Sequence, residues 1–203
     1  MKQHHYKKYE ICKLLIDSGA NLDIKDSDKR TALMYAVINN KYDICKLLIE
    51  KGADLNIQDN KGKTAFMYSI IKYVNSSTIL VKNYDIAKLL IEKGANLDIK
   101  DIQGNTALII TVVFNIFEIF ELLIDRADLN IKNIKENTAL SSALITKKYY
   151  LAKILIDKGA IVSDEDRIKI NNISTFNNLN NLSKINIKKI KETLNKKSTK
   201  TLN

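Results

Sequence analysis

The 203-residue chain contains no proline and no tryptophan, and only two cysteines, Cys12 and Cys45. Two cysteines are too few for a disulfide framework, or for a zinc cage without histidines nearby. The two histidines, His4 and His5, stand at the N-terminus, away from any cluster of acidic residues or cysteines. The sequence therefore predicts no metal site and no histidine-based catalysis.

Long apolar runs and arginine are also scarce. No run approaches the roughly 18 apolar residues that a membrane span requires. Lys13 and Asp17 interrupt the first apolar stretch, so we expect no secretory signal and a cytoplasmic protein. The net charge is +10, but only Arg30, Arg126 and Arg167 are arginine. Because guanidinium suits phosphates and base edges best, this mostly lysine charge is a weak signal for nucleic-acid recognition.

The chain is organised instead by an internal repeat. The octet GANLDIKD occurs at 19–26 and again at 94–101, and Thr-Ala pairs begin at positions 31, 64, 106 and 138. These pairs are separated by 33, 42 and 32 residues. The nine additional residues lie between Lys72 and Asn83, where we expect either a loop or a longer inner helix. A period near 33 indicates a stacked array of repeats.

Each unit contains the same local signals. In the first complete unit, Thr31 predicts the N-cap of a short helix over 32–39. The stretch 42–51 has apolar residues at helical spacing, and Gly52 ends it because glycine enters the left-handed region without a Cβ clash. Residues 55–58 then alternate between apolar and polar, which predicts a short strand before the next turn.

On this pattern, G-A-[DN]-L-[ND]-I followed by T-A-[LF], the chain resembles the ankyrin repeat family over roughly residues 7–162. The resemblance implies an all-α fold, an α-solenoid of about four and a half helix-loop-helix repeats joined by projecting β-hairpin-like loops. One half repeat is followed by repeats that start near 26, 59, 101 and 133, within a domain of residues 1–162. The family's Thr-Pro-Leu-His start is Thr-Ala-Leu-Met in the first complete unit here.

Two local features modify this expectation. The fourth linker, Asp125-Arg126-Ala127, lacks the glycine of the others, so we expect a distorted or frayed helix end there. Cys12 and Cys45 are 33 residues apart and occupy one column of adjacent outer helices. Helix axes lie about 8–10 Å apart, whereas a disulfide needs Cα atoms within about 7 Å. Both cysteines are therefore predicted to be reduced, buried spacers.

The resemblance places partner binding on the loop tips and on the ends of the inner helices, facing a concave groove. The residues assigned to it are Lys25, Arg30, Ile38, Gln58, Lys61, Lys63, Ile71, Lys100, Val113, Phe114, Lys132 and Ile145. Basic tips would flank an apolar strip, with Phe114 as the anchor because aromatic residues dominate interface energetics. In the alternative interpretation, the apolar residues only close the packing between repeats and the lysines only confer solubility.

The sequence contains no glycine-rich phosphate loop, zinc-helix motif or nucleophile–base pair. We therefore expect a non-enzymatic protein–protein interaction module that uses no cofactor and no small-molecule substrate. Its expected partner is a protein with an acidic or amphipathic segment, because the tips are basic and the strip between them is apolar.

An alternative function rests on residues 163–203, expected to form a C-terminal capping segment and a basic, Asn- and Lys-rich tail. Ser163 predicts the cap of a short helix to about Asn171, and 183–194 has the spacing of a weak amphipathic helix. Nine basic and four acidic residues give this segment a charge of +5. Such a tail is compatible with binding to nucleic acid or to an anionic membrane surface. At the other end, residues 7–18 match an outer helix without an inner one, so we expect low hydrogen-exchange protection there.

Overall fold

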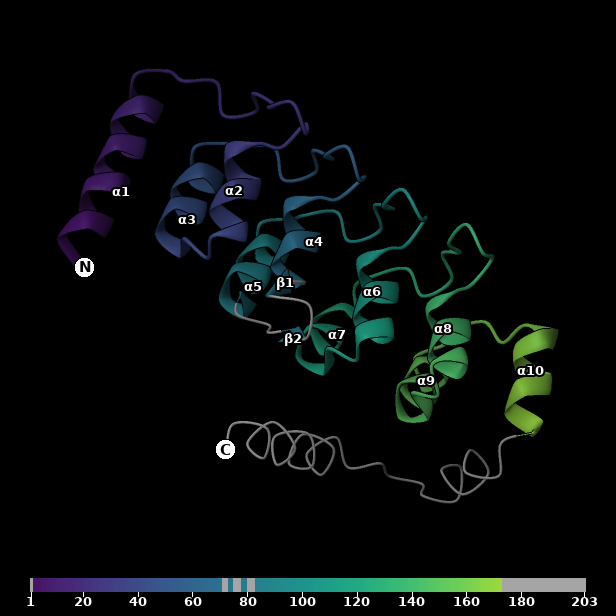
Figure 1. Ribbon diagram of the computed structural model, residues 1–203. Helices are drawn as coiled ribbons and strands as arrows, with labels where there is room; N and C mark the ends of the chain where they lie inside the picture. The colour runs from purple at the N-terminus through teal and green to yellow at the C-terminus, as the bar shows by residue number, and fades with distance from the viewer. Residues whose placement is uncertain (1, 71–72, 75–77, 80–82, 173–203) are drawn as a thin grey trace.

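The computed structural model describes residues 2–70, 73–74, 78–79 and 83–172. Its helices follow one another across the molecule in chain order, with α1 at one end and α10 at the other (Figure 1). The helices are α1 (Lys2–Asp17), α2 (Ala32–Ile38), α3 (Tyr42–Glu50), α4 (Ala65–Ile70), α5 (Tyr84–Glu92), α6 (Ala107–Phe114), α7 (Phe117–Leu123), α8 (Ala139–Ile145), α9 (Tyr149–Asp157) and α10 (Asp164–Asn171).

The helices form two rows. In the inner row, α2 packs against α4, α4 against α6, and α6 against α8. In the outer row, α1 packs against α3, α3 against α5, and α5 against α7. Each inner helix from α2 onward also packs against the outer helix of its own repeat. The all-α solenoid predicted from the sequence is confirmed. Long connections project from one side of the stack (Figure 1), and we call the segments 18–31, 51–64, 93–106 and 124–138 the fingers.

Each inner helix begins at a buried threonine. The Thr31 hydroxyl oxygen accepts a hydrogen bond from the Met34 backbone N–H at 3.4 Å. Thr64, Thr106 and Thr138 accept the equivalent bond at 3.3, 3.4 and 3.2 Å. A cap of this kind satisfies an N–H that has no partner inside the helix. The predicted N-cap is therefore confirmed, and it recurs in the same setting in all four complete repeats.

The outer helices end at glycine where the sequence provides one. Gly52 follows α3 with a φ of 91°, and its N–H donates to the Ile49 carbonyl at 3.1 Å. Helix α7 lacks such a glycine and spans 7 residues, whereas α3 spans 9. After α7, the Arg126 guanidinium donates to the Leu122 carbonyl at 2.9 Å and satisfies one of the terminal acceptors. The predicted distorted end is confirmed as a shortened helix.

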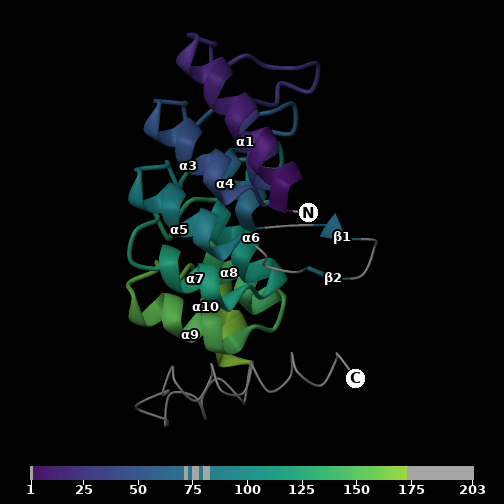
Figure 2. The same ribbon diagram turned by 90° about the vertical axis from the view of Figure 1, so that its left-hand side faces the viewer.

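The described residues of the nine-residue insertion include two short strands. Strands β1 (Tyr73–Val74) and β2 (Thr78–Ile79) pair antiparallel, with Tyr73 opposite Ile79 and Val74 opposite Thr78. The strand pair projects away from the stacked helices (Figure 2). Helix α4 ends at Ile70, so the expectation of a longer inner helix was wrong, and the expected loop contains a strand pair. The two strands lie outside the helix rows (Figure 2), and α4 packs against both α5 and α6 as the other inner helices pack against their neighbours.

Two further expectations were wrong. Residues 55–58 form turns and extended backbone without a strand, because the fingers hydrogen-bond mainly through their tips. Cys45 is fully buried as predicted, but Cys12 is only half-buried. The reason is that no inner helix covers α1 within the described residues, whereas α2 covers α3. Both cysteines are free thiols, as expected.

The last described element covers the end of the core. Ser163 caps α10 by accepting a hydrogen bond from the Asp166 backbone N–H at 3.1 Å, and α10 packs against α8. The Asp166 carboxylate is buried and accepts a hydrogen bond from the Ser141 hydroxyl at 3.0 Å. This confirms the predicted capping helix. The predicted amphipathic helix at 183–194 and the basic tail lie outside the described residues.

Candidate partner-binding groove

The tip of every finger is held by one side chain. Oδ1 of Asp59 accepts hydrogen bonds from the backbone N–H groups of Lys61 and Lys63, both at 2.8 Å. The residue at the same position in the other fingers makes the same pair of bonds, and these residues are Asp26, Asp101 and Asn133. A carboxylate or amide oxygen that binds nearby backbone N–H groups fixes a tight turn. The same pair of hydrogen bonds therefore fixes the turn at the tip of each finger.

Neighbouring tips are also joined to each other. The Asn60 N–H donates to the Asp28 carbonyl at 2.9 Å, and the Ile102 N–H donates to the Lys61 carbonyl at 3.1 Å. The Ile134 N–H continues the series to the Gln103 carbonyl at 3.1 Å. These bonds fix the spacing of the side chains that the fingers present.

A network of tyrosine and acidic side chains connects the first two fingers to their inner helices. The Tyr35 hydroxyl donates to Asp26 at 2.6 Å, and the Tyr68 hydroxyl donates to Asp59 at 2.5 Å. The Arg30 guanidinium lies 5.9 Å from the centre of the Tyr68 ring, and its Nε is 4.0 Å from the Asp59 carboxylate. The Arg30 side chain therefore contacts Tyr68 and Asp59 of the same protein, and it is 25% exposed.

The network changes the acidity of its members. The hydrogen bond from Tyr35 is the main reason that the pKa of Asp26 is lowered. The pKa of Tyr68 is raised to about 12, chiefly by burial and then by its hydrogen bond to Asp59. The pKa of Arg30 is raised, first by a hydrogen bond to the Tyr35 hydroxyl and then by one to Tyr68. Because these shifts move each pKa away from neutrality, Asp26 and Arg30 keep their charges at neutral pH, and Tyr35 and Tyr68 keep their protons.

A groove of about 200 Å³ opens beside this network, between the second and third fingers and α6. We call it the finger groove, and its lining residues are Lys61, Lys63, Asp101, Ile102, Gln103, Asn105, Ile110 and Phe114. Phe114 is 38% exposed, and the neighbouring Val113 is 40% exposed. Ile102, at the tip of the third finger, is 67% exposed. The finger groove therefore combines an apolar surface with two lysines at its edge.

The finger groove brings together three of the residues predicted from the sequence, namely Lys61, Lys63 and Phe114. Val113 adjoins Phe114 on α6, and Ile145 is exposed at the equivalent end of α8. Ile38, at the end of α2, is half-buried, and Ile71 lies outside the described residues.

The remaining predicted residues differ in the contacts that their side chains make. Lys25 and Lys100 are exposed on the fingers, and Lys132 pairs with Glu136 at 3.1 Å. The Gln58 side-chain amide donates to the carbonyls of Gly62 and Lys100, at 2.7 and 2.8 Å. Gln58 thus links two fingers.

No site role was predicted from the sequence for two equivalent tyrosines, Tyr35 and Tyr68, which we call the tyrosine column. Tyr35 and Tyr68 stand four residues after the capping threonine of their repeats, and Ile110 takes that position in the third. Ile110 lines the finger groove. The recurrence of tyrosine at a 33-residue spacing is the signal that would have identified the column.

The described residues contain no group of three His, Cys, Asp or Glu side chains placed to hold a metal ion. Across the same part of the chain, every helix is too short or too polar to cross a membrane.

The paired rows of helices and the linked fingers define the class of helical repeat solenoids. A family model described as ankyrin repeats, with three copies, matches residues 3–101 and 76–166. Since these matches cover most of the 203 residues, the chain belongs to the ankyrin repeat family. Ankyrin repeats are generally protein–protein interaction modules and are typically non-enzymatic. No curated protein matches the chain.

Proposed function

We propose that the chain binds a partner protein in the finger groove and along the adjacent tips. The partner contributes an acidic or amphipathic segment, with an apolar side chain seated against Phe114. The observation that carries this proposal is the placement of an exposed aromatic ring in one groove with Lys61 and Lys63. Binding energy at interfaces is concentrated in a few large side chains that become buried in pockets, and Phe114 is the aromatic side chain that lines this groove.

The rigidity of the fingers supports the same function. Backbone and side-chain hydrogen bonds fix the tips of the second and third fingers, so little conformational entropy is lost when a partner binds. The exposed isoleucines Ile102 and Ile134 extend the apolar surface along successive tips. A segment with alternating apolar and acidic side chains would contact both the apolar surface and the lysines, and the lysines would speed its association.

The test compares two aromatic substitutions of equal exposure. Phe114→Ser removes the proposed anchor, and Tyr84→Ser removes an aromatic residue on the outer helix α5, also 38% exposed. Proteins that co-purify with the wild-type chain from its native host are identified and their affinities measured. We expect Phe114→Ser to weaken binding by about tenfold or more, since loss of an anchor costs about 2 kcal/mol, and Tyr84→Ser to leave it unchanged.

Two results would contradict the proposal. One is that Phe114→Ser weakens binding no more than Tyr84→Ser does, or weakens it only because the variant has lost thermal stability. The other is binding that falls steeply between about 50 and about 200 mM salt and disappears when residues 173–203 are removed, which is the behaviour of phosphate binding by a basic tail.

A further inference from the structure

The third finger differs from the first two in one hydrogen bond. In all three, Oδ1 of the finger aspartate accepts two backbone N–H groups, and for Asp101 these belong to Gln103 and Asn105, both at 2.9 Å. In the first two fingers, Oδ2 of Asp26 and of Asp59 also accepts the tyrosine hydroxyl of its own repeat. Oδ2 of Asp101 accepts no hydrogen bond from the described part of the chain.

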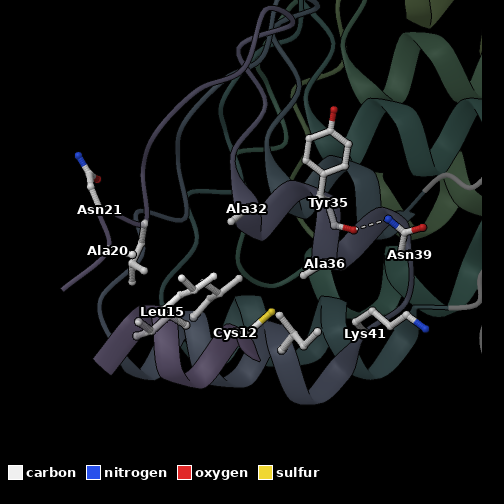
Figure 3. A pocket seen from close by; sticks show the side chains of 13 residues that line it. Cys12, Leu15, Ala20, Asn21, Ala32, Tyr35, Ala36, Asn39 and Lys41 are labelled. Carbon is white, nitrogen blue, oxygen red and sulfur yellow. Dashed lines mark hydrogen bonds between the residues drawn. The ribbon is translucent and has the colours of Figure 1, made fainter. Parts of the chain in front are cut away.

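The residue on the inner helix explains the missing donor. Tyr35 of α2 and Tyr68 of α4 occupy the position that Ile110 takes in α6, and isoleucine has no hydroxyl group. Figure 3, which draws the lining of a pocket between α1 and α2, shows the Tyr35 hydroxyl pointing away from Cys12 of α1, and this hydroxyl binds the aspartate of the first finger. In the third repeat, Ile110 and the finger aspartate both line the finger groove. The finger groove therefore lies where the ring of a third tyrosine would stand.

The cation that accompanies such a ring is also present at the finger groove. The Arg30 guanidinium, from the first finger, lies 5.9 Å from the centre of the Tyr68 ring in the second repeat. Lys63 takes the same position in the second finger, because it stands four residues after Asp59 as Arg30 stands four residues after Asp26. Its ammonium lies 5.8 Å from the Tyr68 ring centre, and Lys63 lines the finger groove as well. An aromatic ring in the groove would therefore meet Lys63 as the Tyr68 ring meets Arg30.

The fourth repeat does not contain this arrangement. Ser142 takes the tyrosine position in α8 and is buried. Asn133 takes the position of the finger aspartate, and its side-chain nitrogen donates to Oδ1 of Asn105 at 2.8 Å. An amide nitrogen donates hydrogen bonds and does not accept them. Of the four finger residues at this position, Asp101 alone combines a second carboxylate oxygen with the lack of a tyrosine in its own repeat.

We propose that the partner segment inserts a tyrosine side chain into the finger groove, where it takes the place of the tyrosine that the third repeat lacks. This inference rests on the proposed function, since it names the side chain that the partner seats against Phe114. The hydroxyl of the partner tyrosine donates to Oδ2 of Asp101, and the ring contacts Ile110 and Phe114, which line the groove.

The charges of the finger groove favour tyrosine over the other side chains that could fill it. Lys61 and Lys63 line the groove with positive charge, and Asp101 lines it with negative charge. Arginine or lysine could donate to Asp101, but the two lysines would repel either of them. Phenylalanine would fill the groove and leave the carboxylate without a donor once water is displaced, which costs binding energy. Tyrosine carries a neutral donor on an aromatic ring and so meets both requirements.

Three capped peptides test the preference, namely Glu-Ala-Tyr-Ala-Glu and the same peptide with phenylalanine or arginine at its centre. Binding is measured from the NMR shifts of the Gln103 and Asn105 amides, which donate to Asp101. We expect the tyrosine peptide to bind the wild-type chain about tenfold more tightly than the phenylalanine peptide, because it adds a hydrogen bond to a charged group. Asp101→Asn retains an oxygen that can fix the turn, as Asn133 does, and should reduce this difference to about threefold or less.

A second variant supplies the missing tyrosine from the chain itself. Ile110→Tyr should fold, because Tyr68 occupies the same position in the second repeat, and urea unfolding checks this. The new side chain would fill the finger groove, so the variant should bind none of the peptides. Ile168→Tyr adds a tyrosine at an exposed site on α10 and should leave the preference unchanged. If Ile110→Tyr does not fold, Asp101→Asn decides the question alone.

Several outcomes would overturn the inference. They are equal affinities of the tyrosine and phenylalanine peptides, tighter binding of the arginine peptide, a preference that survives Asp101→Asn, and amides that do not shift at millimolar peptide concentrations. Phe114→Ser distinguishes this failure from failure of the proposed function. Equal affinities that both fall in Phe114→Ser would leave the proposed function standing, whereas equal affinities that Phe114→Ser does not change would contradict both.

Discussion

The second finger depends on one buried carboxylate, and its removal tests how the fingers are held. Asp59 accepts hydrogen bonds from Lys61 N–H and Lys63 N–H at 2.8 Å and from the Tyr68 hydroxyl at 2.5 Å. Its side chain is 2% exposed. A hydrogen bond to a charged group contributes about 1.5–3 kcal/mol, and here water can replace part of the loss at the exposed Lys61. We therefore expect Asp59→Ala to lower the free energy of unfolding by about 2–4 kcal/mol.

The first finger provides the matched control. Asp26 accepts the same three bonds, from Asp28 N–H, Arg30 N–H and the Tyr35 hydroxyl, but it is exposed. Asp26→Ala should therefore lower the urea midpoint by less than half as much as Asp59→Ala. Asp59→Asn should cost about 1 kcal/mol, because an amide oxygen can accept both backbone bonds, as Asn133 does in the fourth finger.

Urea unfolding followed by circular dichroism at neutral pH gives the order of the three variants. Hydrogen exchange at the Lys61 and Lys63 amides shows whether the finger itself opens, which matters because repeats can unfold one by one. Equal urea midpoints for Asp59→Ala and Asp26→Ala, or an Asp59→Asn variant as unstable as Asp59→Ala, would refute this role of the Asp59 carboxylate.

Three further predictions concern the core and the titrating groups. Phe120→Ala should lower the free energy of unfolding by about 3–5 kcal/mol in urea, because the ring is buried at 1% exposure; a loss below about 1 kcal/mol would contradict the packing. Absorbance at 295 nm should show Tyr68 and Tyr150 ionising near pH 12, since burial raises the pKa of each to about 12. The pKa of tyrosine in the unfolded chain is about 10, so the stability that neutral Tyr68 contributes is present below pH 10 and is lost as the pH rises towards 12. Tyr68→Phe should therefore reduce the fall of the urea midpoint between about pH 10 and about pH 12. A fall equal to that of the wild-type chain would contradict this role of Tyr68. Ellman's reagent should modify Cys12 in the folded chain and Cys45 only in denaturant, because burial raises the pKa of Cys45 to about 12; rapid reaction of both thiols would be inconsistent with the fold.

The fold could be predicted where helix-capping and helix-ending residues recur at the same position of each repeat. Thr31 and its three equivalents cap the inner helices, and Gly52 and its equivalents end the outer ones, so one unit served as a template for the others. The insertion had no template, because no other unit contains it. Its composition was compatible with a loop or a helix, and pairing between Tyr73 and Ile79 depends on chain reversal that composition does not specify.

The lining of the candidate groove could be predicted where it depends on position within the repeat. Phe114, Lys61 and Lys63 were assigned by column, and the structure places them in one groove. The contacts of Arg30 with Tyr68 and Asp59 cross from one repeat to the next, so a pattern read within one unit could not reveal them. The exposure of Cys12 depends on whether an inner helix packs against α1, and this is decided by the arrangement of neighbouring helices and not by the sequence of one repeat. The domain boundary between 162 and 163 stays a prediction.

The most direct test of the account is to ask which surface touches the partner in the native host. A photo-crosslinking phenylalanine analogue is placed at Phe114 or Ile145 on the inner helices, and at Tyr84 or Lys88 on the outer helix α5. The account predicts that the two inner-helix positions give adducts with the same protein and that the α5 positions give none. Adducts obtained only from α5, or equally from all four positions, would contradict it.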